Sequence, residues 1–316
     1  MEKNWSINES AKIRMMKEVD SNWKKILEIG PLYNPLFKKE DYNVFYADIN
    51  STEEVKSLYR QLPREVYEKI VNIDYVIDGT YTNTFNETGV KFDYVVSSHV
   101  FEHIPNPIAY LLDVSNILED NGKVCLLLPD KEFTFDHYRE NSSFADMYDV
   151  YIRGEANNTP RLFLDVEFCR VDENDSIKYW DKTFSKYPNP NIDFALEEYN
   201  NYIHDFENKH FYGHYWVFSD RSFLRILESL MSLNILPYKL VSFFPTAYKD
   251  NTFGVILELD YSIKNNPEFR KQQINDMREI SKNIEKKHFE INARDIIKEN
   301  IELKETINKI INILKE

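Results

Sequence analysis

Short apolar runs recur along the N-terminal part of the chain, each bounded by glycine, proline or aspartate. They are too short for helices, and they are continuously apolar rather than alternating, which is typical of strands buried on both faces of a parallel sheet. We predict such strands at residues 24–30, 43–48, 73–79, 92–99 and 122–130. Helical sequence separates them, including a helix that Asn106 can cap and Pro107 can begin. This alternation predicts an α/β protein with a mostly parallel sheet.

The pattern changes after the fifth strand. Residues 130–215 are rich in Tyr, Phe, Asp and Asn without a clean period, and we interpret them as an insertion or lid. An amphipathic helix follows at 219–233, with Ser219 as its N-cap. Two strand-like runs, 238–246 and 253–261, complete the domain.

The chain ends in a long helical pattern. From Pro267 to Glu316 it is rich in Lys, Glu, Asn and Ile and contains no further proline or glycine. Met277, Ile280, Ile284 and Ile291 share one heptad frame, and Ile296, Leu303, Ile307, Ile310 and Leu314 share another after a phase shift. We expect an N-terminal helical segment at 1–23, a main domain at 24–262 and a helical tail at 263–316.

Composition limits the partners. The net charge of −14 repels phosphate backbones, and the chain has no basic tract interleaved with aromatics, so we expect no nucleic-acid partner. The two cysteines lack the spacing of a disulfide framework or a zinc cluster. No stretch approaches the roughly 18 apolar residues of a membrane span, and the N-terminus lacks the apolar core of a signal peptide. We therefore expect a cytoplasmic protein.

Polar residues stand where the predicted strands end. Ligands of parallel α/β sheets bind at the carboxyl ends of the strands, so these residues indicate a binding edge. They are Glu28 and Gly30, Asp48, Asp78 and Gly79, and Ser97, Ser98 and His99. Asp48 comes eighteen residues after Gly30 and is suited to accept both hydroxyls of a ribose.

Four segments in order, LEIGPLYNP, ADIN, VIDG and FDYVVSSHVFEHIPNP, resemble the successive motifs of class I S-adenosylmethionine-dependent methyltransferases. The similarity covers residues 24–130 well and 219–260 more loosely. It implies a Rossmann-like sheet whose last two strands form an antiparallel pair. It also implies S-adenosylmethionine as cofactor and S-adenosylhomocysteine as product.

The resemblance also implies roles for individual residues. The Gly30 turn approaches the methionine part of the cofactor, Asp48 holds the ribose, and Asp78 with Gly79 flanks the adenine. The cofactor-binding residues that it implies are Glu28, Gly30, Pro31, Asp48, Ile49, Asp78, Gly79, Ser97 and Ser98. The usual second and third glycines are Leu32 and Asn34 here, and asparagine tolerates a left-handed backbone. The turn is similar to the LEIGP variant in methyltransferases of bacterial polysaccharide gene clusters.

Methyl transfer to a hydroxyl needs positioning and a base. His99 is the first candidate, and His214 and His137 can reach the same cleft from the insertion; a structural role is the alternative for each. Glu102 and His103 resemble the Glu-x-x-Glu-His metal site of some O-methyltransferases, with His99 in place of the first glutamate. These three residues are therefore the candidate ligands for a divalent metal, although metal-free relatives keep a Glu-His pair here too.

We expect an O-methyltransferase that acts on a sugar or sugar-nucleotide precursor of capsule or other surface polysaccharide. Lys131 and Arg139, after the fifth strand, suit a polar acceptor. One alternative is methylation of a phosphate or phosphoramidate group on a glycan precursor, which these two cations would contact. Another is a non-catalytic assembly module whose tail forms a homo-oligomer or binds a glycosyltransferase.

Overall fold

A seven-stranded sheet forms the centre of the protein. The computed structural model describes residues 9–19, 23–154, 160–171, 175–188, 190, 192–204 and 213–313. The strands are β1 (Ile26–Ile29), β2 (Val44–Asp48), β3 (Tyr75–Val76), β4 (Phe92–Ser98), β5 (Leu118–Pro129), β6 (Tyr238–Phe244) and β7 (Thr252–Leu259). Their order is β3-β2-β1-β4-β5-β7-β6. The first five are parallel, and β7 runs antiparallel to both β5 and β6. This confirms the predicted fold class, although β3 is much shorter than expected.

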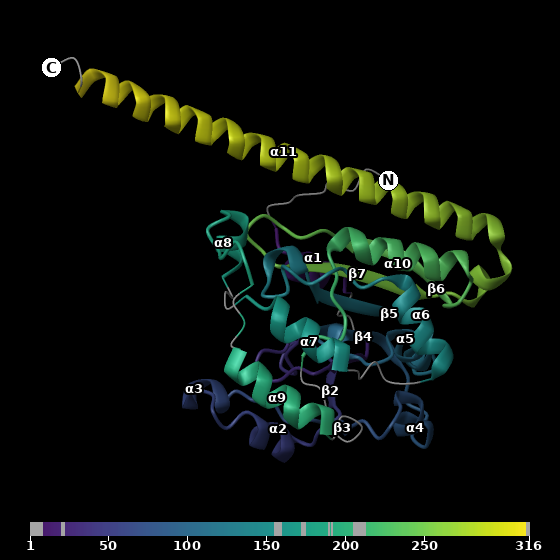
Figure 1. The fold of residues 1–316 in the computed structure, drawn as a ribbon. Coiled ribbons are helices and arrows are strands. Elements are labelled where there is room, and N and C mark those ends of the chain that lie inside the picture. Colours follow the sequence, from purple (N-terminus) through teal and green to yellow (C-terminus); the bar gives the residue numbers. More distant parts are fainter. Residues whose placement is uncertain are drawn as a thin grey trace.

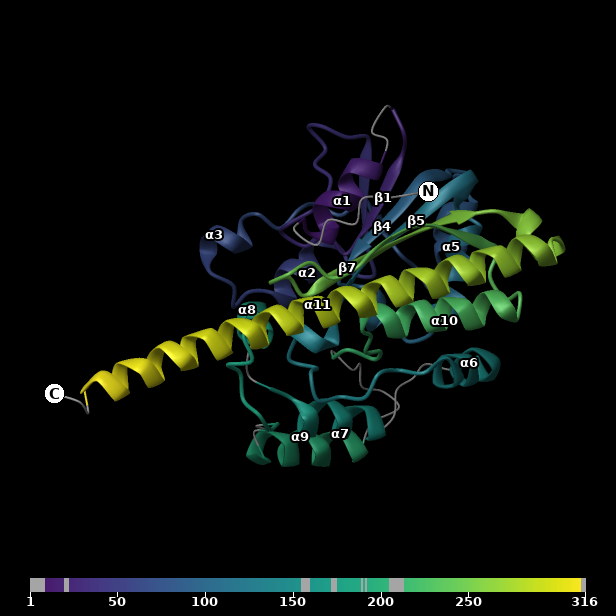
Figure 2. The ribbon, with the colours of Figure 1, turned by 90° about the horizontal axis from the view of Figure 1, so that it is seen from above.

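Helices cover both faces of the sheet. Those flanking it are α1 (Ala11–Glu18), α2 (Thr52–Leu58), α3 (Arg64–Tyr67), α4 (Tyr81–Asn86), α5 (Pro107–Ser115) and α10 (Asp220–Ser232). Figure 2 shows α1 on one side of the sheet and α10 on the other. Neighbouring strand residues therefore enter opposite cores: Val96 packs with Met15 of α1, and Val95 packs in the cluster that contains Leu224 of α10. Burial on both faces explains why the strands are continuously apolar.

The insertion is largely helical in its described residues. It contains α6 (Phe144–Arg153), α7 (Pro160–Cys169), α8 (Ser176–Trp180) and α9 (Ile192–His204). α7 and α9 lie against each other, away from the sheet, whereas α6 contacts α5 and α10 (Figure 2). The sequence showed no clean period here because apolar residues of these helices are not confined to one buried face: in α9, Ala195 is buried, whereas Phe194 and Leu196 are exposed.

The tail forms one helix, α11 (Pro267–Ile313), as predicted. Its first half packs on α10 and β6, where Met277 and Ile284 are buried, and Arg278 pairs with Glu228 of α10. Its C-terminal part extends past the rest of the protein (Figure 1). The side chain of Ile291 lies outside the described residues. Among helices of the described chain, none is both long enough and apolar enough to cross a membrane.

Candidate active site

A tight turn follows β1 and packs against the residue after His99. Gly30 adopts φ 63°, and a Cβ added to it would lie 2.8 Å from Val100 Cγ2. Leu32 is also left-handed, with φ 47°, and its carbonyl accepts a hydrogen bond from the Val71 amide at 2.9 Å. Asn34 does not have a positive φ. The non-glycine residue that takes the left-handed conformation is therefore Leu32, and the sequence had suggested Asn34.

Replacing Gly30 with alanine should destabilise the protein and weaken cofactor binding. The new methyl group would add a clash with Val100 to a left-handed strain of about 1–2 kcal/mol. Gly89→Ala is the matched control, because Gly89 has φ 62° but nothing within 4 Å of its Cβ position. Thermal unfolding and titration with S-adenosylhomocysteine would check this. Equal losses in the two variants would show that contact with Val100 is unimportant.

The Glu28 carboxylate shapes this turn from inside. Its two oxygens accept hydrogen bonds from the amides of Leu36 at 2.6 Å and Phe37 at 3.0 Å. The side chain is buried, and burial raises the pKa of Glu28 to about 7. Both oxygens are thus occupied by the loop after β1, and Glu28 positions the turn.

The remaining candidate cofactor residues lie along one edge of the sheet. Parallel pairing sets Asp48 beside Val76 of β3, and Ile29 beside Ser97 of β4. The half-buried Asp48 accepts a hydrogen bond from the Asn50 amide at 2.9 Å, and the next residue, Ile49, is 74% exposed. Pro31 is buried, Ser98 is half-buried, Asp78 is exposed, and Gly79 is left-handed with φ 71°. Ser97 is buried, and its hydroxyl has no hydrogen-bond partner in the described chain.

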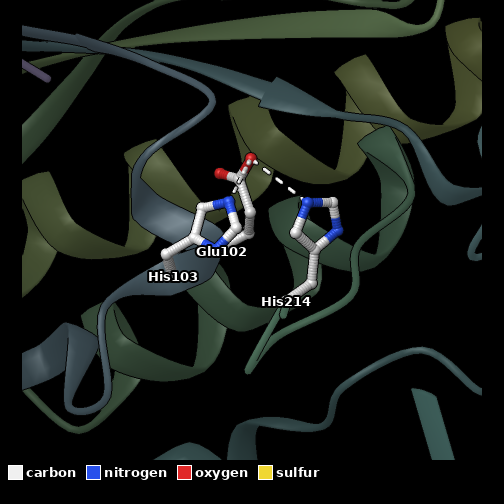
Figure 3. Close-up of side chains that lie close together, drawn as sticks. All are labelled: Glu102, His103 and His214. Atoms are coloured by element: carbon white, nitrogen blue, oxygen red, sulfur yellow. Dashed lines mark ion pairs between the residues drawn. The ribbon is translucent and has the colours of Figure 1, made fainter. Parts of the chain in front are cut away.

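A buried glutamate lies among three histidines just after this edge, and Figure 3 shows two of them, His103 and His214, beside it. Glu102 is in the short 3-10 helix η1 (Phe101–His103) and is fully buried. Its Oε1 lies 3.9 Å from His99 Nδ1, 3.9 Å from His103 Nε2 and 3.8 Å from His214 Nε2. Neither carboxylate oxygen has a hydrogen-bond partner among the described residues. Burial raises the pKa of Glu102 to about 7.

Asp136 orients the third histidine. Its Oδ2 hydrogen-bonds His214 Nδ1, and its Oδ1 accepts from Arg139 at 2.9 Å. Arg139 in turn donates to Asp165 at 2.7 Å. Burial opposes protonation of His214, but the hydrogen bond and charge of Asp136 outweigh it and raise the pKa of His214. With the proton held on Nδ1, Nε2 of His214 is left as a base that faces Glu102.

Of the other two candidate bases, His99 also borders Glu102, whereas His137 does not. His99 lies at the sheet edge with φ 54°, and its Nε2 is 3.0 Å from Thr252 Oγ1. His137 lies outside the cluster and its Nδ1 contacts the Glu132 carbonyl at 2.9 Å. The sequence placed Asp136 among the charged residues after the fifth strand, but it did not predict the pairing of Asp136 with His214. The sequence signal for Asp136 was its position beside the candidate base His137, whereas in the structure it contacts His214.

Glu102→Gln should stabilise the metal-free protein at high pH. The folded pKa near 7 exceeds the ordinary value of 4.5, so the folded state binds more protons between these values and wild type loses stability as pH rises through them. We expect the variant's advantage to grow by about 2–3 kcal/mol between pH 5 and pH 8. Urea unfolding with a chelator present would measure it, with the exposed Glu119→Gln as control. An advantage that does not change with pH would contradict the buried charge.

The fold and the strand-edge site define a class I methyltransferase architecture. A family model described as a methyltransferase domain matches residues 17–230. The chain belongs to this family of methyltransferase domains, and the order of its seven strands agrees with the Rossmann-like sheet expected of it.

Several solved methyltransferase structures match the chain at low sequence identity. The CurJ carbon methyltransferase shares 11% identity over 79% of this chain and 54% of its own, with a TM-score of 0.37. A SAM-dependent methyltransferase from Aquifex aeolicus shares 11% over 78% and 89%, with a TM-score of 0.36. The mitomycin 7-O-methyltransferase MmcR shares 10% over 79% and 52%, with a TM-score of 0.35. The chain thus spans about half the length of CurJ and of MmcR. No curated protein matches the sequence.

Proposed function

We propose that this protein methylates a hydroxyl group, with S-adenosylmethionine along the edge formed by the Gly30 turn, Asp48 and Asp78. The observation that carries the proposal is the His214–Asp136 pair. His214 of this pair lies 3.8 Å from Glu102. Glu102 follows Val100 by two residues, and the Val100 side chain packs on Gly30, so the pair is close to the proposed cofactor turn. A carboxylate-oriented histidine is a general base, the group that methyl transfer to a hydroxyl needs.

The proposed reaction is one displacement. The acceptor oxygen attacks the methyl carbon as the bond from that carbon to the sulfonium breaks, which leaves the neutral thioether S-adenosylhomocysteine. The hydroxyl proton moves to His214 Nε2, and Asp136 stabilises the imidazolium that results. Glu102 faces that nitrogen and adds to this stabilisation when it is ionised.

The proposed acceptor is a sugar or sugar nucleotide used for a surface polysaccharide. Support comes from the LEIGP turn, which resembles that of polysaccharide-cluster methyltransferases. The phosphate-methylating alternative loses its expected contacts: Arg139 is buried between Asp136 and Asp165, and the Lys131 ammonium donates to the His137 carbonyl at 2.7 Å. Neither cation is available to an acceptor.

Incubation with radiolabelled S-adenosylmethionine and a panel of sugars, sugar phosphates and sugar nucleotides tests the proposal. Label should enter a hydroxyl of at least one compound, and Asp136→Asn should slow its transfer. Binding of S-adenosylhomocysteine without label transfer to any hydroxyl compound would contradict the acceptor class. Absence of binding would favour a non-catalytic assembly role through α11.

The same cluster supports a second candidate role, as a divalent metal site. Glu102, His103 and His214 each offer a ligand atom, and these atoms lie within 4.8 Å of one another. The unpartnered Glu102 oxygens fit a cation, and Asp136 would orient His214 as carboxylates orient metal-bound histidines. The ion would polarise the acceptor oxygen. Loss of activity with a chelator and its recovery with Zn²⁺ or Mn²⁺ would support this role, and full activity in the chelator would exclude it.

A further inference from the structure

A cavity lies next to the segment that carries Asp136. Its volume is about 680 Å³. It opens between the 3-10 helix η2 (Lys131–Phe133), α8, the first turns of α10, and α11. Phe135 and Asp136 contact His214, whereas Phe133 and His137 line the cavity. None of Glu102, His103 and His214 lines it, so this cavity is distinct from the proposed methyl-transfer site.

Cations stand at its rim. Lys182, Lys186 and Arg225 line the cavity and are exposed. Within the described chain, none of the three has a carboxylate at ion-pair distance, whereas their neighbour Arg221 pairs with Glu285 of α11 at 3.3 Å. The chain has a net charge of −14, and Asp130, Glu132 and Asp220 also line this cavity. An anion is therefore favoured only beside the three cations.

One carboxylate oxygen that lines the cavity, Asp220 Oδ2, accepts no hydrogen bond from the described residues. Asp220 is 1% exposed, and its Oδ2 has no hydrogen-bond partner in the described part of the chain. His288 Nε2 lies 4.0 Å from this oxygen, and burial lowers the pKa of His288, which disfavours its charged form. The adjacent carboxylate of Asp130 is already satisfied by the Thr246 hydroxyl at 2.7 Å and the Glu132 amide at 3.1 Å. A buried acceptor without a partner costs free energy, so a ligand hydroxyl at Asp220 would remove that cost.

Aromatic side chains form the walls. The rings of Phe133 and Trp180 stack at 3.9 Å, and those of Tyr179 and Phe184 lie 4.5 Å apart. Both pairs line the cavity. Such walls suit the apolar faces of a sugar ring.

We propose that this cavity binds a glycosyl phosphate, with its phosphate at Lys182, Lys186 and Arg225 and a sugar hydroxyl donating to Asp220. A regulatory role for that ligand rests on the proposed function, but its binding does not. A free sugar phosphate and a nucleotide sugar share this chemistry.

The test uses the full chain and the fluorescence of its tryptophans, since Trp180 lines the cavity. Glucose 1-phosphate and UDP-glucose each contain both a sugar and a phosphate and are the two full probes. Glucose and inorganic phosphate each contain only one of these groups and are the partial probes. We expect glucose 1-phosphate to bind at least about tenfold more tightly than either partial probe. Binding of UDP-glucose in competition with it would identify nucleotide sugars as the source, and failure to compete would identify the free sugar phosphate.

Two variants locate the site. Lys182→Ala/Lys186→Ala should weaken binding of glucose 1-phosphate about tenfold or more, and Asp220→Asn should weaken glucose 1-phosphate but not phosphate. Lys271→Ala, an exposed lysine elsewhere on α11, is the charge control. Absence of binding by both glycosyl probes at 10 mM, or unchanged affinity in the double variant, would overturn the proposal. Titration of the same proteins with S-adenosylhomocysteine tests the proposed function separately, because the cavity contains none of the cofactor residues.

Discussion

His214→Ala is expected to lower kcat about 10²- to 10⁴-fold, the range that a positioned general base contributes. The variant should still bind S-adenosylhomocysteine, because the expected cofactor residues lie along the ends of β1 to β4. Single-turnover methyl transfer at saturating cofactor measures the chemical step. His137→Ala is the matched control, since His137 lies outside the cluster, and it should retain most of the activity.

The pH profile separates a base from a structural histidine. His214 must be unprotonated to act, so kcat/KM should fall as pH drops through its pKa, which Asp136 holds above the ordinary value. Asp136→Asn removes that charge, and the acidic limb should move to lower pH as the maximal rate falls. A His214→Ala enzyme with wild-type kcat, or a limb that does not move in Asp136→Asn, would contradict the assignment.

Asp48→Ala is expected to weaken S-adenosylhomocysteine binding by about two orders of magnitude. Hydrogen bonds to a charged group contribute about 1.5–3 kcal/mol each, and a carboxylate at this strand end can accept from both ribose hydroxyls. Calorimetric titration would measure the loss. Asp41→Ala removes an exposed carboxylate from the loop before β2 and should bind normally.

Asp48→Asn refines this test. The amide keeps one acceptor oxygen but loses the charge, so its affinity should fall between those of wild type and Asp48→Ala. Unchanged binding in both Asp48 variants would mean that the ribose lies elsewhere along the edge. Weak binding in Asp41→Ala as well would indicate a general effect of charge.

Local signals in the sequence were sufficient for most of the fold. Continuous apolar runs identified the strands, because burial on both faces requires apolar residues at every position. Asn106 and Ser219 cap α5 and α10 as predicted, since capping depends on only three or four consecutive residues. The helices of the insertion escaped detection because their apolar residues do not follow one buried face, although α9 is as long as α10.

The sequence by itself determined the order of elements, the glycine turn after β1 and the row of polar residues where the strands end. It also placed His99, Glu102 and His103 together, because residues three or four apart share a turn. Only the tertiary structure decided that Asp136 and His214, 78 residues apart, form a pair, and that Glu102 is buried without a hydrogen-bond partner. Such contacts depend on how the insertion packs over the sheet, and no local pattern encodes that packing. The same holds for the cavity lined by η2, α8, α10 and α11, whose walls come from four separate parts of the chain.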